Sequence, residues 1–115
     1  MAETELAGQE RPEPAAVPPG GTILVLNGFY EGLELPIDRD RVVVGRGRGA
    51  DVILAEPTIS RAHAAIACDG ECFFVEDLGS TNGTLVNGER CERTQLGSGD
   101  EIRMGRLQLR VKLPV

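Results

Sequence analysis

Short apolar runs alternate with turn residues along the chain from residue 22 onward. The runs are rich in Val, Ile and Leu and are three to seven residues long, which is typical of β-strands. Nowhere does the helical period of roughly 3.6 residues persist for three turns. The pattern predicts an all-β chain with strands over residues 22–26, 33–37, 42–44, 52–54, 62–68, 72–76, 84–86, 102–104 and 107–113.

Glycine marks many of the boundaries between these runs. The chain has 15 glycines, and Asn87-Gly88 is one of the pairs that end an apolar run. Asp69-Gly70 lies between two runs that are long enough to pair, which is a strong hairpin signal. Many short strands separated by such turns favour a β-sandwich or barrel built as a single domain.

The first 21 residues have a different composition. They contain four Glu, one Arg, small residues and no aromatic residue, together with Pro12, Pro14, Pro18 and Pro19. Such a segment has too few apolar side chains to offset the entropy of ordering it. We therefore expect a disordered, acidic, Pro-rich tail over residues 1–21 and one domain over residues 22–115.

Composition excludes several classes of function. The net charge of −6 argues against a nucleic-acid binder, which needs a basic surface. No apolar run approaches the ~20 residues that cross a bilayer, and no secretory signal is evident, so we expect no membrane partner. One His and three scattered Cys lack the spacing of a metal site. We expect a cytoplasmic protein with no metal and no cofactor.

Three polar patches interrupt the apolar runs, and each lies in a predicted loop or next to one. In chain order they are Gly45-Arg46, Ser60-Arg61-Ala62-His63 and Ser80-Thr81-Asn82-Gly83. Together they supply arginine, hydroxyl groups and backbone N–H groups. These are the groups that bind a phosphate, with its charge of about −2 and its acceptor oxygens.

In this order and spacing, the patches resemble the forkhead-associated (FHA) domain, a reader of phosphothreonine. The resemblance covers residues 22–113. It implies a two-sheet β-sandwich of about eleven short strands with binding loops at one end. It also implies a phosphothreonine-dependent interaction module in Ser/Thr kinase signalling, whose partner is a phosphothreonine-containing protein or peptide.

The resemblance assigns phosphopeptide-binding roles to residues of all three patches. Arg46 is expected to pair with the phosphate, and Ser60 to donate its hydroxyl to a phosphate oxygen. Arg61 is expected to contact the phosphate or the peptide backbone. Thr81 is expected to shape the phosphate pocket, and Asn82 to bond the backbone of the bound peptide.

Further residues are expected to support the site without touching the ligand. His63 would tie neighbouring loops together by hydrogen bonds, and Asn87 would support the loops from behind. Gly45 and Gly83 would permit tight turns and close approach of the backbone to the ligand.

An enzyme is the first alternative. Gly45-x-Gly47-x-Gly49 is glycine-rich, but it lacks the Lys-Ser/Thr of a phosphate-hydrolase loop. Ser60 and His63 are three residues apart on a segment expected to be extended, so they should face opposite sides and form no dyad. We therefore expect no catalytic activity and no catalytic residue.

The second alternative is a docking domain that binds without phosphate. FHA domains of that kind tend to lose the phosphate-binding residues. Arg46, Ser60, Thr81 and Asn82 are all present, which favours the phosphate-dependent function. The predicted tail adds one further hypothesis, because Thr4 lies between Glu3 and Glu5. Phosphorylated Thr4 would be a ligand that the domain could bind within its own chain.

Overall fold

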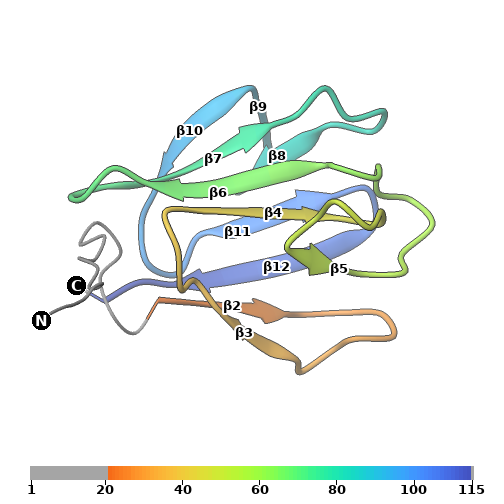
Figure 1. Cartoon of the computed structure of the whole chain (residues 1–115), viewed down its shortest axis with the longest axis horizontal. Coiled ribbons are helices and arrows are strands. Elements are labelled where there is room, and N and C mark those ends of the chain that lie inside the picture. Colours follow the sequence, from red (N-terminus) through yellow and green to blue (C-terminus); the bar gives the residue numbers. More distant parts are fainter. Residues whose placement is uncertain (1–20, 115) are drawn as a thin grey trace, which may run out of the picture.

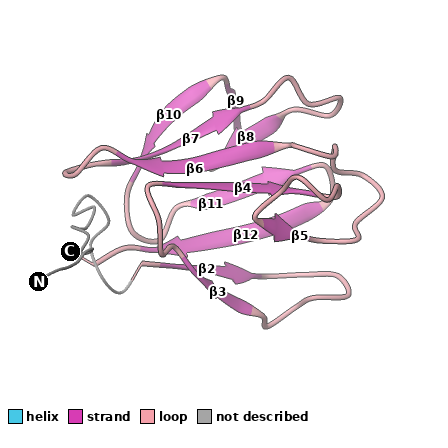
Figure 2. Ribbon diagram, in the orientation of Figure 1, coloured by secondary structure: helices cyan, strands magenta, loops and turns pink. Residues whose placement is uncertain are grey.

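The fold is known from a computed structural model that describes residues 21–114. These residues form a two-layered, all-β structure with eleven strands and no helix (Figure 2). Both the predicted all-β class and the predicted sandwich are confirmed. The predicted tail, apart from Gly21, and the hypothesis on Thr4 lie outside the described residues.

The first sheet has five strands in the order β10-β7-β6-β4-β5. Its pairs are antiparallel except for β4 and β5, which run parallel. The parallel pair is short, because β5 has only two residues. The strands are β4 (Arg41–Gly45), β5 (Val52–Ile53), β6 (Ala64–Cys68), β7 (Phe73–Asp77) and β10 (Arg93–Leu96).

The second sheet has six strands in the order β3-β2-β12-β11-β8-β9, and all its pairs are antiparallel. The β2 strand, near the start of the described chain, pairs with β12 at its end. The strands are β2 (Thr22–Val25), β3 (Glu34–Pro36), β8 (Thr84–Val86), β9 (Glu89–Cys91), β11 (Glu101–Met104) and β12 (Leu107–Lys112).

Two strands had no sequence signal of their own. β9 and β10 are mostly polar, and neither contains an apolar run. Each forms the edge of its sheet, where one side of the strand faces solvent. Polar and charged residues are favoured there because they prevent pairing with another chain. Hydrophobic alternation therefore misses these two polar edge strands, although it detects the edge strands β3 and β5.

The core lies between the two sheets and is almost wholly aliphatic. Alternate residues of β2 and β12 are buried, as expected for strands with one face inward. Met104 and Ile102 of β11 face Val75 and Ile66 in the same apolar cluster, and all four have no exposed surface. This packing fixes the position of both sheets and of the loops that leave them.

The strand register brings the predicted site loops to one end of the sandwich. Ala64, at the start of β6, pairs with Val44 near the end of β4 and with Asp77 at the end of β7. In the other sheet, Thr84 at the start of β8 pairs with Met104 at the end of β11. The loops after β4, before β6 and between β7 and β8 therefore emerge together, on the right in Figure 1. No described helix could cross a membrane.

Candidate functional site

His63 connects the loops at this end. Its side chain is fully buried, although it lies just outside β6. The Ser60 backbone N–H donates to Nδ1 of His63 over 3.0 Å, and Nε2 lies 2.8 Å from the Gly83 carbonyl oxygen. The ring therefore joins the loop before β6 to the loop before β8.

The two partners define the chemical state of the ring. Nδ1 accepts a hydrogen bond, so it carries no proton, whereas the Gly83 carbonyl can only accept one. The proton therefore resides on Nε2, which donates to that carbonyl. A neutral imidazole with both nitrogens satisfied is a structural link, and neither nitrogen is left to act as a base.

The segment from Ser60 to His63 is a turn, so the expectation of an extended segment is wrong. The turn brings the Ser60 backbone to the ring, which strict alternation along a strand would forbid. The Ser60 hydroxyl points elsewhere, because Oγ accepts from the Thr81 N–H over 3.1 Å. This Ser–His contact therefore lacks the hydroxyl that a catalytic pair requires.

The loop after β4 lies directly on the segment 59–62. The Arg46 and Gly47 N–H groups donate to the carbonyls of Ser60 and Arg61 over 3.0 and 3.1 Å. A Cβ at residue 45 would overlap the Arg61 carbonyl oxygen, so only glycine permits this approach. Gly45 thus supports the site by letting two backbones meet.

Arg46 is held in place by its own side chain. Nε donates to the Ile59 carbonyl over 2.9 Å, while the residue as a whole is exposed. The two terminal nitrogens of the guanidinium have no hydrogen-bond partner within residues 21–114. The two terminal nitrogens, whose geometry suits a phosphate, are therefore positioned and available.

Asp77 organises the loop between β7 and β8. Its Oδ2 accepts from the N–H groups of Gly79 and Ser80 over 3.0 and 3.1 Å. Its Oδ1 accepts from the hydroxyls of Ser80 and Thr84 over 2.5 and 2.7 Å. Gly83 completes the turn with a φ of 82° and donates its N–H to Ser80 Oγ. Thr81 and Asn82 are thereby held at the exposed tip.

Asn82 and Thr58 fasten this tip to the neighbouring loops. The Asn82 side-chain amide donates to the Thr58 carbonyl over 2.8 Å. The Thr58 hydroxyl donates to Glu56 over 2.6 Å and accepts from the Arg106 N–H over 2.8 Å. Thr58 and Asp77 had been given no role from the sequence. For Asp77 the available signal was an Asp two residues before Gly79, the spacing of an Asx turn.

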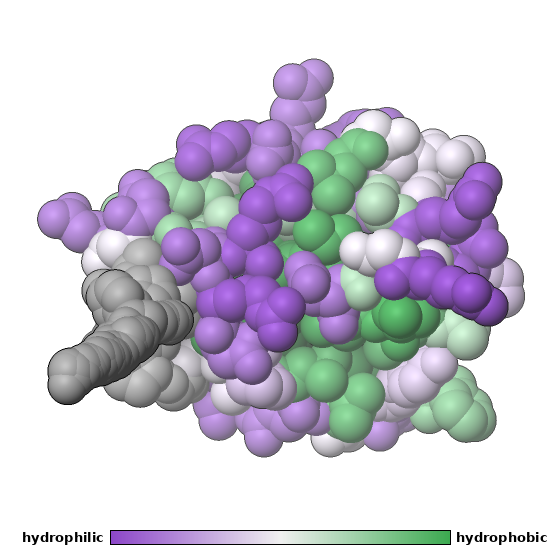
Figure 3. Space-filling model, viewed as in Figure 1, coloured by the Kyte–Doolittle hydropathy of each residue, from purple (hydrophilic) through white to green (hydrophobic). Residues whose placement is uncertain are grey.

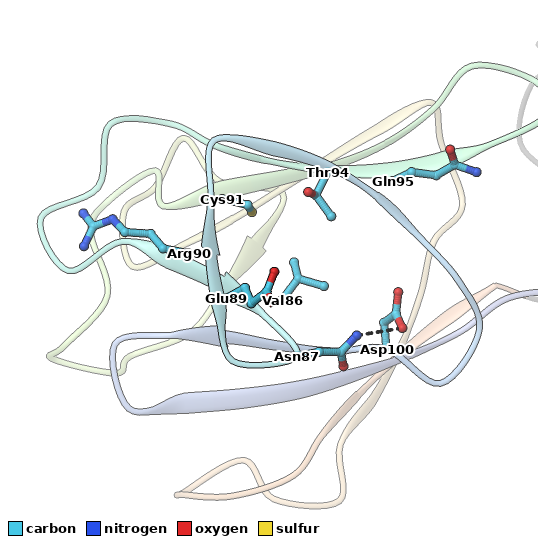
Figure 4. Close-up of a pocket in the computed structure, with 8 residues that line it drawn as sticks. All are labelled: Val86, Asn87, Glu89, Arg90, Cys91, Thr94, Gln95 and Asp100. Carbon is cyan, nitrogen blue, oxygen red and sulfur yellow. Dashed lines mark hydrogen bonds between the residues drawn. The ribbon is translucent and has the colours of Figure 1, made fainter.

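Asn87 lies away from the other predicted residues. It adopts a φ of 51° in the turn after β8, and its side chain bonds Asp100 and the Glu101 N–H over 3.0 Å each. The three-residue strand β8 separates it from Gly83 by about 10 Å of chain. Figure 4 shows Asn87 and Asp100 joined at the rim of a separate pocket of about 370 Å³. The structure therefore brings together all the predicted site residues except Asn87.

Two carboxylates around the loops have shifted pKa values. Burial alone would raise the pKa of Asp77, but the hydrogen bonds from Ser80, Thr84 and Gly79 outweigh burial and lower it. Hydrogen bonds from Thr58 likewise lower the pKa of Glu56. Both groups are therefore held as carboxylates that stabilise loop structure.

The comparisons with known proteins agree with this arrangement. A sequence model described as the FHA domain matches residues 42–105, which include every residue named in the three patches. The chain belongs to the FHA domain family.

Two curated relatives of this FHA domain match most of the chain. An oxoglutarate dehydrogenase inhibitor of Corynebacterium jeikeium is 35% identical over 113 residues, which are 95% of this chain and 78% of that protein. The glycogen accumulation regulator GarA of Mycobacterium tuberculosis is 36% identical over 94 residues. The match covers 81% of this chain, which spans 58% of the length of GarA.

A solved FHA domain gives the same result in three dimensions. It comes from a structural and functional analysis of phosphothreonine-dependent FHA domain interactions. It is 33% identical, has a TM-score of 0.76, and the match covers 83% of this chain and 97% of that one. The predicted family and the predicted sandwich are confirmed.

The first prediction concerns the buried ring. His63→Ala should lower the free energy of unfolding by about 2–4 kcal/mol, because it leaves a cavity and two unsatisfied backbone groups. Urea denaturation measures the change. Phe29→Ala is the control, since Phe29 is 93% exposed and its removal should change stability little. Unchanged stability of His63→Ala would disprove the structural role of the ring.

The second prediction concerns Asp77 and pH. Asp77→Asn should destabilise the domain by about 1–3 kcal/mol at pH 7, because an amide cannot accept all the bonds of the carboxylate. A lowered pKa in the folded state gives stability that is present above the unfolded pKa and lost as pH falls through the folded pKa. The difference in the free energy of unfolding between the wild type and Asp77→Asn should therefore narrow as the pH falls below 3.8, the ordinary pKa of an Asp side chain.

Denaturation curves at several pH values between 7 and 3 measure this difference. The control is Glu31→Gln, which removes an exposed carboxylate whose side chain has no hydrogen-bond partner within residues 21–114. If the difference in the free energy of unfolding between the wild type and Asp77→Asn stayed constant over this range, the charge of Asp77 would contribute nothing to stability.

Proposed function

We propose that this FHA domain binds a phosphothreonine-containing protein through the loop after β4, the turn 58–63 and the loop between β7 and β8. The predicted class of function, a phosphothreonine-dependent interaction module in Ser/Thr kinase signalling, is confirmed at the level of the family. The assignment of individual residues to the ligand is our proposal. The observation that carries it is the anchored Arg46 beside Ser60, with its terminal nitrogens available.

Arg46 provides the charge that the phosphate needs. Its Nε bond to the Ile59 carbonyl fixes the plane of the guanidinium, so little side-chain entropy is lost when ligand binds. The terminal nitrogens can then form two parallel bonds to phosphate oxygens. A lysine at this position would offer only a point charge.

Ser60 adds a hydroxyl donor beside the arginine. Its Oγ already accepts from the Thr81 N–H, and its own proton has no acceptor within residues 21–114. That proton can be donated to a phosphate oxygen. The same bond places Thr81 next to Ser60, so the Thr81 side chain forms the wall of the phosphate pocket.

Asn82 and Arg61 provide the further contacts to the phosphopeptide. Asn82 uses its amide nitrogen on the Thr58 carbonyl, which fixes the side chain and leaves Oδ1 to accept a peptide N–H. Arg61 is exposed beside the loop after β4, where it reaches the phosphate or the peptide backbone. His63, Gly45 and Gly83 hold the loops and do not touch the ligand.

The domain acts by binding and carries out no chemistry of its own. Relatives of this chain are named as an inhibitor and as a regulator, which supports a regulatory role through a partner protein. A phosphate-independent docking mode would make no use of an anchored Arg46 next to a free hydroxyl proton. Phosphorylated Thr4 is a second ligand of the same chemistry, supplied by the chain itself.

The third prediction tests the phosphate requirement. A phosphothreonine peptide is selected from a degenerate library, and its Kd is compared with that of the unphosphorylated peptide by calorimetry. Each charge-assisted bond contributes about 1.5–3 kcal/mol, so losing two or three should weaken binding by about 10²-fold or more. Equal affinity for both peptides, or no enrichment from the library, would contradict the proposed function.

Variants of Arg46 extend this test. Arg46→Ala should abolish binding, and Arg46→Lys should weaken it because the bidentate fork is lost. Arg41→Ala is the matched control, because it removes the same charge from the opposite end of β4. Melting temperatures close to that of the wild type would show that all three variants fold. If Arg41→Ala weakened binding as much as Arg46→Ala, the site would lie elsewhere.

A further inference from the structure

Arg48 belongs to a groove whose positive charge exceeds what one phosphate needs. The groove has a volume of about 610 Å³ and lies between the loop after β4 and the turn before β6. Three of its six lining residues are arginine, and none is acidic. The lining residues are Arg46, Gly47, Arg48, Gly49, Arg61 and Ala62. In the space-filling view, strongly hydrophilic side chains project from the loop end of the molecule (Figure 3).

The backbone holds these arginines close together. The Ala50 N–H donates to the Gly47 carbonyl over 3.1 Å, which closes a turn with Arg48 near its apex. The Gly47 N–H donates to the Arg61 carbonyl, and a Cβ at residue 47 would lie 2.9 Å from the Arg61 Cβ. Arg48 is therefore carried on a fixed turn that abuts Arg61.

The acidic residues nearest in sequence to this groove are already engaged. Asp51 accepts from Arg39 and from the Val43 N–H, and Glu56 accepts from Thr58. Within residues 21–114, none of the groove arginines forms an ion pair. In a chain of net charge −6, an unneutralised group of three cations is a local exception.

A comparison of the charges on the groove and on the ligand indicates a role for the additional arginine. Phosphothreonine carries about −1.5 to −2 near neutral pH, whereas the three guanidinium groups carry three positive charges. Arg46 is directed to the phosphate by its bond to Ile59, and Arg61 lies at the same turn as Ser60. Arg48 has neither constraint, and its exposed side chain lines the groove.

We propose that this groove recognises a second anionic group close to the phosphothreonine in the same peptide, and that Arg48 is the residue that contacts it. The inference rests on the proposed function, since it assumes that the phosphothreonine lies at Arg46. The second group is a carboxylate or a further phosphate, because a guanidinium binds both in the same bidentate way. Arg48 would then determine specificity and leave phosphate recognition itself unchanged.

The test scans a second negative charge along the ligand. The starting peptide has one phosphothreonine and neutral flanking residues. In two further series, Glu or a second phosphothreonine replaces each of the three residues on either side in turn. Calorimetry on the wild-type protein should show one position at which Kd falls about tenfold, with a larger gain for phosphate than for Glu because its charge is greater.

Arg48→Ala should remove that gain and leave the Kd for the starting peptide within about twofold of the wild-type value, a difference of roughly 0.4 kcal/mol. Arg41→Ala, which removes the same charge at the far end of β4, should keep the gain. The difference between the two variants shows whether the effect is local or reflects net charge. Raising the salt concentration should reduce the gain, because the groups involved are exposed.

The outcomes separate this inference from the proposed function. If the starting peptide fails to bind, the proposed function is wrong and the inference falls with it. If it binds and no second charge improves its Kd, the inference alone is wrong. A gain that persists in Arg48→Ala would also overturn it, because another residue would then read the second charge.

Discussion

The buried imidazole of His63 is the contact on which the binding end depends. Its two ring nitrogens join the backbone of Ser60 to that of Gly83, and these residues lie in loops that lead to opposite sheets. An imidazole can accept at one nitrogen and donate at the other, so it satisfies a backbone N–H and a backbone carbonyl at once. Because the ring is fully buried, water cannot replace either bond.

The two sheets position the loops around this ring, and local contacts made by individual residues shape the surface that the loops form. Register places the ends of β4, β7 and β11 at one edge, so the loops meet without long connections. Gly45 allows the loop after β4 to touch the Arg61 backbone. Asp77 then shapes the tip that carries Thr81 and Asn82. A rigid scaffold that carries its polar groups on loops at one end is well suited to binding an extended peptide.

Much of this arrangement could be predicted from the sequence, for identifiable reasons. Central strands such as β2 and β12 alternate buried and exposed residues, which hydrophobic periodicity detects. The edge strands β9 and β10 have no such pattern because their residues are mostly polar, and only Leu96 among them is buried. Residue types that phosphate requires, namely arginine and hydroxyls beside glycine-rich turns, drew attention to the three patches. The resemblance to the FHA family then assigned a role to each residue. Thr58 escaped notice because its role depends on contacts with Asn82 and Arg106, which lie on two other loops.

Two details show where sequence reasoning reaches its limit. The segment from Ser60 to His63 was expected to be extended, and a turn instead brings the Ser60 N–H to the ring. Asn87 was expected from the family resemblance to support the site loops from behind, and in the structure its side chain bonds Asp100 beyond the end of β8. In both cases the sequence identifies a polar residue that makes structural hydrogen bonds, but the path of the backbone determines which groups that residue contacts.

The central claim is that phosphothreonine binds at the loop end organised by His63. The most direct measurement is an NMR titration of the isotope-labelled protein with a selected phosphothreonine peptide. The account predicts the largest amide shifts at residues 46–49, 60–62 and 80–83, and no comparable shift when the unphosphorylated peptide is added. Largest shifts around Asn87 and the pocket beside it, or equal shifts with both peptides, would contradict the account.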